Sequence, residues 1–209
     1  RGRSVLVADC DVHHADITAA LGCEGGTGFI ELLQQDDKSF EGMKQYINET
    51  GFNVQLIGGP AVPQDPASLD PSSFAAILSE LQKQYEVVCL DLQPYFNRFW
   101  KQAVDLNEPI YLVVSNDAVD IRSAKRLVEY LRSLGCADDR IKLIYNASRG
   151  GEVISAATVS EQIGLSIAIE LPHDAERTKA SQEKGKPFIL ENSGPLGEGI
   201  EKLVDLIYS

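Results

Sequence analysis

The sequence predicts a single α/β domain built on a mostly parallel sheet flanked by helices. Short apolar runs recur between longer amphipathic stretches, which is the pattern of buried parallel strands joined by helices. The length of 209 residues allows one sizeable core and favours one domain over 1–209 rather than two. The first apolar run ends in an acidic cluster, Asp9, Asp11 and Asp16, which is the first candidate for a functional site.

The strands are expected where short apolar runs occur, and the helices where apolar residues recur at helical spacing. The helix over 71–84 begins at Asp70-Pro71, a good N-cap residue followed by proline at the first helical position. The Pro- and Gly-rich stretch 58–70 before it predicts a surface loop rather than a domain boundary. Strands are predicted at 4–8, 54–57, 87–92, 110–115, 141–146 and 165–170, and helices at 40–48, 71–84, 118–134, 175–184 and 199–208.

The composition restricts the classes of partner. A formal net charge of −12 disfavours nucleic acid and anionic lipid, because both need a cationic surface. No apolar run approaches the ~20 residues that span a bilayer, and no basic, apolar leader opens the sequence. The cysteines form no C-x-x-C pair, which fits reduced thiols in a cytoplasm. We therefore expect a soluble cytoplasmic protein that neither binds nucleic acid nor inserts directly into a membrane.

Polar residues collect at the carboxyl ends of the predicted strands, which is where open parallel sheets bind ligands. The first strand ends in Asp9 and Asp11, the third in Asp91, and the fifth in Asn146. Neighbouring carboxylates repel each other unless a cation or a water-activating task uses them, so the cluster predicts Mg²⁺ and phosphate chemistry. A lone aspartate at such a position is more often a helix cap or part of a turn, and this is the role we expect of Asp16.

A phosphate-binding loop is the next requirement, and the sequence does not contain G-x-x-x-x-G-K-[ST]. The glycine-rich piece at 25–28 lacks the lysine and follows a short helix rather than a strand. A turn is its expected role.

Taken in order, the segments resemble the deviant P-loop ATPases of the MinD/ParA group, within the SIMIBI class of P-loop NTPases. The most similar branch is the pilus-assembly one called CpaE or TadZ. The segment SVLVADCDVHHAD at 4–16 looks like the family's second strand and switch I, and YEVVCLDLQP at 85–94 resembles its Walker B strand. Further blocks at 19–34, 115–131, 141–146 and 163–188 resemble later parts of the family pattern in the same order.

The resemblance implies a role for each candidate residue. Asp11 would be catalytic and orient the attacking water, while Asp91 would hold the water shell of Mg²⁺. Asp9 would belong to the metal site and would support the switch strand. The positions that match the family's adenine-contacting Asn and L-P-x-D loop are Asn146, Pro172 and Asp174.

Family members begin with a strand, the loop K-G-G-x-G-K-[ST] and a helix, and this first strand and Walker A loop are missing from the 209 residues. A parallel sheet without a central strand would expose unpaired backbone and apolar surface, so we expect the chain to be a fragment. ATP and Mg²⁺ would then depend on a phosphate loop outside it. His13, His14 and Gln93 depart from the family pattern, so an inactive nucleotide site, as in a pseudo-ATPase, is also compatible with the sequence.

The function that the resemblance implies is that of an ATPase or pseudo-ATPase acting as a localisation or assembly factor for type IV (Flp/Tad) pilus or secretion machinery. Its partners would be proteins of that assembly, with a homodimer as the expected oligomer. Its location would be the cytoplasm, at a cell pole or at the inner membrane face through partners. The C-terminal segment 201–208 is acidic, so a basic lipid-binding tail is not expected.

Two other classes share part of the pattern. A haloacid-dehalogenase-like phosphatase would use Asp9 as nucleophile and Asp11 as acid/base, with Ser115-Asn116 at its second motif. However, no acidic pair follows at the end of a later strand. A receiver domain also has acidic strand ends, but it needs a lysine where Asn146 stands, and it is shorter than this chain.

Overall fold

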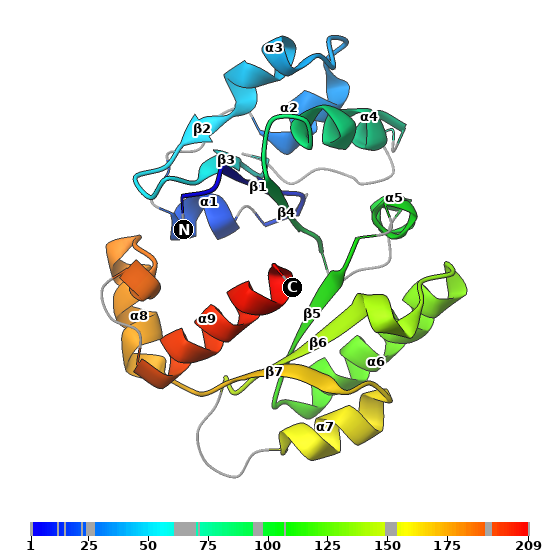
Figure 1. Cartoon of the computed structure of the whole chain (residues 1–209), viewed down its shortest axis with the longest axis vertical. Coiled ribbons are helices and arrows are strands. Elements are labelled where there is room, and N and C mark those ends of the chain that lie inside the picture. The colour runs from blue at the N-terminus through cyan, green and yellow to red at the C-terminus, as the bar shows by residue number, and fades with distance from the viewer. Residues whose placement is uncertain are drawn as a thin grey trace. The chain divides into compact units, whose positions relative to one another are not determined.

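In the structure, a computed structural model, the strands of the described residues form two sheets rather than the one that the sequence predicts (Figure 1). The chain divides into two compact units, Arg1–Gln93 with Asn97–Gln102 and Pro94–Phe96 with Ala103–Ser209. One domain over 1–209 stays a prediction. The residues that the structure describes are 2–11, 13–14, 16–21, 23, 28–60, 70, 72–93, 98–106, 108–148, 154–190 and 194–208, without the side chains of 98 and 99.

The first unit contains a four-stranded sheet of order β2-β3-β1-β4. Its centre is β1 (Val5–Asp9), which pairs in parallel with β3 (Gln55–Ile57) and with β4 (Val87–Asp91). The short β2 (Asn48–Glu49) adds an antiparallel edge beside β3. The backbone of β1 is therefore paired on both edges, and its residue Leu6 is completely buried.

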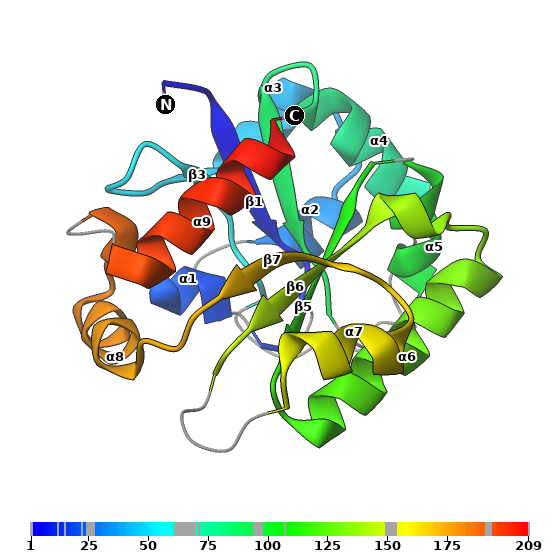
Figure 2. The ribbon, with the colours of Figure 1, turned by 60° about the horizontal axis from the view of Figure 1, so that its bottom comes forward.

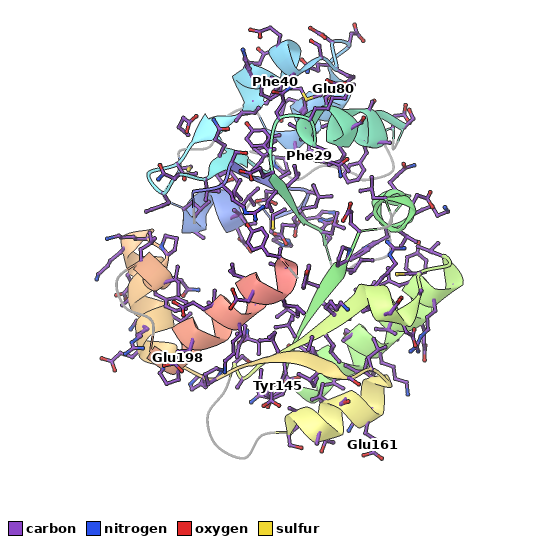
Figure 3. All side chains as sticks on the ribbon, in the orientation of Figure 1. Phe29, Phe40, Glu80, Tyr145, Glu161 and Glu198 are labelled. Atoms are coloured by element: carbon purple, nitrogen blue, oxygen red, sulfur yellow. The ribbon has the colours of Figure 1, made fainter. Side chains whose placement is uncertain are left out.

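Two helices of the first unit pack against each other through aromatic side chains. Phe29 of α2 and Phe74 of α4 are both fully buried, and their rings meet edge to face with centroids 5.7 Å apart. Phe29 is labelled in Figure 3, where its side chain lies below α2 and α4. The helices that begin in this unit are α1 (Asp16–Ala20), α2 (Phe29–Gln34), α3 (Phe40–Met43), the 3₁₀ helix η1 (Lys44–Tyr46), α4 (Ser72–Leu81) and α5 (Arg98–Asp105).

Gly28 starts α2 where the chain passes directly over the loop after β3. A Cβ atom at this position would lie 2.3 Å from the carbonyl oxygen of Gly58, which is closer than any real contact. The same oxygen accepts a hydrogen bond of 2.8 Å from the N–H of Phe29, and the N–H of Gly28 donates to the Glu31 carboxylate at 2.9 Å. Only glycine therefore fits here. The preceding residues 25–27 of the predicted turn lie outside the described residues.

Replacing this glycine tests the close approach. Gly28→Ala should lower the free energy of unfolding by about 1–3 kcal/mol, because the added methyl group must push α2 away from the backbone of the loop. The matched control is Gly51→Ala, since a Cβ atom there has nothing within 4 Å. Urea denaturation of both variants measures the difference, and equal stability would contradict the packing described.

The second unit contains a three-stranded, fully parallel sheet of order β5-β6-β7. The central strand is the most buried, with Leu143 and Ile144 both fully covered. Figure 2 shows α6 and α7 on one side of this sheet and α9 on the other. The elements are β5 (Ile110–Ser115), α6 (Ala118–Ser133), the 3₁₀ helix η3 (Asp138–Arg140), β6 (Ile141–Asn146), α7 (Ala156–Ile163), β7 (Ile167–Leu171), α8 (Ala175–Lys184), the 3₁₀ helix η4 (Phe188–Leu190) and α9 (Gly194–Ile207).

The strands β4 and β5 are each paired on one side only within the described part of the chain. Apolar side chains on these strands are correspondingly more open than on β1 and β6. Val113 is 58% exposed and Cys89 is exposed, whereas parallel strands are normally buried on both faces. The two strands therefore present backbone N–H and C=O groups that no described strand satisfies.

The predicted helix over 40–48 is wrong in its second half. The α-helix ends at Met43, a 3₁₀ turn follows, and the chain is extended at Asn48–Glu49. The reason is a tertiary contact: the side-chain amide of Asn48 donates to the carbonyl oxygens of Tyr46 and Leu56, both at 3.3 Å, and so fixes the edge strand to β3.

The carboxylate of Asp70 accepts the N–H of Ser72, the first residue of α4, at 2.9 Å, which is the hydrogen bond expected of a capping side chain. Pro71 and most of the predicted loop, 61–69, lie outside the described residues. Among the helices that the structure describes, none is both long enough and apolar enough to span a lipid bilayer.

Candidate functional site

Three of the predicted site carboxylates meet at the carboxyl ends of β1 and β4. The parallel register places Asp9 directly opposite Asp91. The pairing continues one residue further, because the N–H of Cys10 donates to the carbonyl oxygen of Asp91 at 3.0 Å. Asp11 follows at once, and its charge and that of Asp91 influence each other. The first unit thus brings Asp9, Asp11 and Asp91 together, as the sequence predicts.

Asp9 is a buried carboxylate, and one of its two oxygens accepts a hydrogen bond. Its side chain is 1% exposed, and Oδ1 accepts the N–H of Asp11 at 3.2 Å. Oδ2 has no hydrogen-bond partner among the described residues. Burial raises the pKa of Asp9 to about 6; the N–H of Asp11 opposes this shift, and the charges of Asp91 and Asp11 add to it. Asp9 is therefore placed to support the turn after β1.

The raised pKa of Asp9 makes folding stability depend on pH. Because the folded-state pKa of about 6 exceeds the ordinary value of 3.8, the folded state binds the proton more tightly. The stability from Asp9 is fully present below 3.8 and is lost as the pH rises through about 6. The Asp9→Asn variant has no carboxylate to ionise, so it does not lose this stability as the pH rises. The difference between the unfolding free energy of the variant and that of wild type should therefore rise by on the order of 1–2 kcal/mol from acid to weakly alkaline pH.

Urea unfolding of both proteins at several pH values measures this difference. Asp36→Asn is the matched control, since Asp36 is exposed and lies away from the strand ends. A wild-type-to-variant difference that stays constant across the pH range would contradict the burial of an ionisable Asp9.

Asp11 lies in the opposite electrostatic situation. Its Oδ1 accepts the N–H groups of His13 at 2.7 Å and His14 at 2.9 Å, and also a hydrogen bond from Nε2 of Gln93. Burial raises the pKa of Asp11, but the hydrogen bonds from Gln93 and from the two N–H groups outweigh it, so the net pKa is lowered. Asp11 is therefore an ionised carboxylate, as the water-orienting role requires.

Asp91 lies at the accessible side of the cluster. Burial of the strand end, followed by the charges of Asp11 and Asp16, raises the pKa of Asp91, although its side chain still reaches solvent. Asp16 is the first residue of α1 and not the residue before the helix, so the helix-cap role that we expected for it is one position off.

A magnesium ion fits Asp91 better than Asp9. Mg²⁺ keeps several of its waters and uses only one or two carboxylates together with substrate phosphates. The exposed Asp91 can reach such a water shell, whereas Asp9 is almost fully covered. Among the described residues, no group of three His, Cys, Asp or Glu side chains is arranged to hold a metal ion. Both metal roles stay predictions.

The predicted nucleoside-binding residues lie in the second unit, at the carboxyl ends of β6 and β7. Asn146 pairs with Leu171 in the parallel register, and the N–H of Ala147 donates to the Leu171 carbonyl oxygen at 2.9 Å. The loop after β7 is tied to the same place, because Nδ1 of His173 lies 3.1 Å from the carbonyl oxygen of Ala147. Asn146 and Pro172 therefore lie at one edge of this sheet.

Asp174, the third of these residues, has a structural task. It is the N-cap of α8, and its Oδ1 accepts the N–H of Arg177 at 3.2 Å. Its Oδ2 lies 3.4 Å from the Arg177 guanidinium. Nucleotide contact by Asp174 stays a prediction.

The geometry does not favour the phosphatase alternative. A nucleophilic carboxylate must touch its substrate, and Asp9 is 1% exposed. The hydroxyl of Ser115 is also engaged, since it donates to the carboxylate of Asp120 and accepts the N–H of Asp117 at 3.2 Å. These bonds organise the start of α6 rather than a phosphate site.

One residue of the site was not predicted from the sequence. Gln93, which follows β4, is 2% exposed, and its side chain reaches Asp11. The sequence offers only a weak signal, a polar residue two positions after Asp91 at a strand end, where the family pattern has no glutamine.

Comparison with known proteins gives distant relatives along the whole chain. The septum site-determining protein MinD of Thermotoga maritima is 23% identical over 207 residues, which cover 97% of this chain and 76% of MinD. A chloroplast MinD homologue of Arabidopsis thaliana is 23% identical over 210 residues, which cover 95% of this chain and 63% of that protein. No protein-family model matches the chain.

Solved structures of the same group share the fold. A ParA family ATPase from Chlorobium tepidum superposes with a TM-score of 0.83 at 16% identity, covering 100% of this chain and 87% of that one. MinD from Pyrococcus horikoshii, solved with Mg-ADP, has a TM-score of 0.80 at 19% identity, with 99% and 84% covered. MinD in the MinC:MinD complex of Aquifex aeolicus gives 0.80 at 17%, with 100% and 85% covered. The predicted α/β class is confirmed: the chain is distantly similar to MinD proteins in sequence and shares the fold of MinD and ParA structures.

Proposed function

We propose that this chain carries the switch and nucleoside-binding residues of a MinD/ParA-type ATPase that binds ATP with Mg²⁺. The observation that carries the proposal is the ionised Asp11, held at the end of β1 beside Asp91 of β4. It occurs in a chain that aligns with MinD over 97% of its length. A D-x-D turn that lies next to a second acidic strand end favours a role in phosphate chemistry over a role as a helix cap.

The roles of the carboxylates follow from their surroundings. Asp11 uses Oδ1 for hydrogen bonds within the fold, which leaves Oδ2 to orient the attacking water. Asp9 holds the backbone N–H of Asp11 and so keeps the turn in place. Asp91 is the residue that would hold a water of the Mg²⁺ shell. The bound metal ion and a phosphate loop supply the charge stabilisation of the transition state.

Asn146 suits recognition of the adenine edge, because one side-chain amide offers both a donor and an acceptor. It is half-buried at the end of β6, beside the loop that holds Pro172. The phosphate contacts are a separate requirement. Since G-x-x-x-x-G-K-[ST] does not occur in the 209 residues, the proposal needs a phosphate loop from residues outside them.

The water-orienting role of Asp11 is tested in the full-length protein by Asp11→Asn. The amide keeps the shape of the side chain but loses the charge, so the ATP hydrolysis rate should fall by roughly 10² or more while the Kd for ATP changes by less than about threefold. Steady-state ATPase assays and calorimetric titration with Mg-ATP measure the two quantities.

The control for this test is Asp36→Asn, which removes an exposed carboxylate away from the strand ends and should leave both quantities unchanged. Wild-type protein that does not bind Mg-ATP would sink the proposal. Wild-type protein that binds but does not hydrolyse it would show a pseudo-ATPase.

The finer proposal is that the protein acts as a localisation or assembly factor for Flp/Tad-type pilus or secretion machinery, working as a homodimer with protein partners in the cytoplasm or at a pole. Its support is the resemblance of the segments at 4–16 and 85–94 to the CpaE/TadZ branch. Protein partnership has a parallel in the MinC:MinD complex of Aquifex aeolicus. The formal net charge of −12 favours protein partners over nucleic acid or anionic lipid.

A deletion strain tests this finer proposal. Loss of the gene should abolish pilus assembly, and wild-type protein should restore it, with both followed by electron microscopy of the cell surface. Normal pili together with misplaced division septa in the deletion strain would instead indicate a MinD-type role.

A further inference from the structure

Gln93 lies at the end of β4 and is fixed there at both its backbone and its side chain. It is 2% exposed, and its carbonyl oxygen accepts the indole N–H of the buried Trp100 at 3.0 Å. Its side-chain nitrogen Nε2 donates to Oδ1 of Asp11 and lies 2.7 Å from Nδ1 of His13. The hydrogen bonds from the buried Gln93 amide to two residues of one turn are costly to break, because the freed polar groups would be left without partners.

The two carboxylate oxygens of Asp11 differ in their hydrogen bonds. Oδ1 receives three donors, the N–H groups of His13 and His14 and the amide of Gln93. Oδ2 has no hydrogen bond from a described residue, and the imidazole Nδ1 of His14 lies 3.7 Å from it. The N–H groups belong to the same turn as Asp11, so Gln93 is the donor that ties the carboxylate to a different strand.

The contact with His13 has a defined proton arrangement. Nε2 of Gln93 must face Asp11, because an ionised carboxylate only accepts hydrogen bonds. The same amide group can then only donate to His13, so Nδ1 of His13 is the acceptor and its proton sits on Nε2. The neutral Nε2–H tautomer of His13 is therefore part of the arrangement.

We propose that Gln93 is a positioning residue: it holds the Asp11 carboxylate so that Oδ2 points at the attacking water, and it uses His13 as a tautomer-specific second acceptor. The assignment rests on the proposed ATPase function of the same site. It gives a purpose to a buried glutamine at a place where the sequence alone showed only a departure from the family pattern.

The kinetic test compares variants of the full-length protein. Gln93→Met keeps the side-chain length but removes both donors, so kcat should fall by roughly 10- to 100-fold while KM for ATP stays nearly constant. Gln93→Asn retains the amide and should recover part of kcat. Gln82→Met is the matched control, because Gln82 is exposed and distant in sequence from the turn. Unchanged kcat in Gln93→Met would overturn the positioning role.

The second test does not depend on hydrolysis. Two-bond ¹H–¹⁵N correlation spectra of histidine-labelled protein report the tautomer of His13, which is assigned by its loss in His13→Asn. Wild-type protein should show the Nε2–H form, and Gln93→Met should show a mixture of forms. If wild-type protein does not bind Mg-ATP, the proposed function fails, and if it binds without hydrolysis, the protein is a pseudo-ATPase. In both cases the Gln93 contact is decided by this spectrum. A wild-type Nδ1–H tautomer would overturn it.

Discussion

Parallel pairing of β1 with β4 is the interaction on which the candidate site depends. Because both strands run in the same direction, their carboxyl ends reach one edge together, and the register sets Asp9 opposite Asp91. A shift by one residue would turn every side chain of β1 to the other face of the sheet and bring the buried Leu6 out of the core. Burial of the apolar residues of β1 therefore sets the register, and the register sets the position of Asp9 at the strand end.

Placing like charges at one edge has a cost, and the structure offsets it in different ways for two neighbouring residues. Asp9 is enclosed, so its pKa rises to about 6 and the neutral form becomes accessible. Asp11 is surrounded by N–H donors, so its pKa falls and the charge is retained. Two carboxylates two residues apart thus acquire different ionisation behaviour, mainly from burial and hydrogen bonding, which is how many sites separate structural from reactive groups.

The sequence predicts those parts of the fold that depend on local pattern. The strands at 110–115 and 141–146 and the helix at 175–184 have the predicted bounds, because apolar runs and helical spacing mark them clearly. The structure adds the N-cap at Asp174, which was not predicted from the sequence. Short elements were missed. The two-residue strand at Asn48 exists only through its contact with β3, and α2, α5 and α7 are too short for their periodicity to stand out.

The residues of the candidate site also fall into those that the sequence predicts and those that it does not. The carboxylates at the strand ends follow from topology, so the sequence could predict them, but the partner of Asp11 is 82 residues away and no local pattern marks it. Gln93 and His13 each looked like a loss of a family feature when considered alone. Together they surround one carboxylate oxygen with hydrogen bonds and leave the other available for chemistry. The two departures from the family pattern are therefore parts of one hydrogen-bonded arrangement rather than two separate losses.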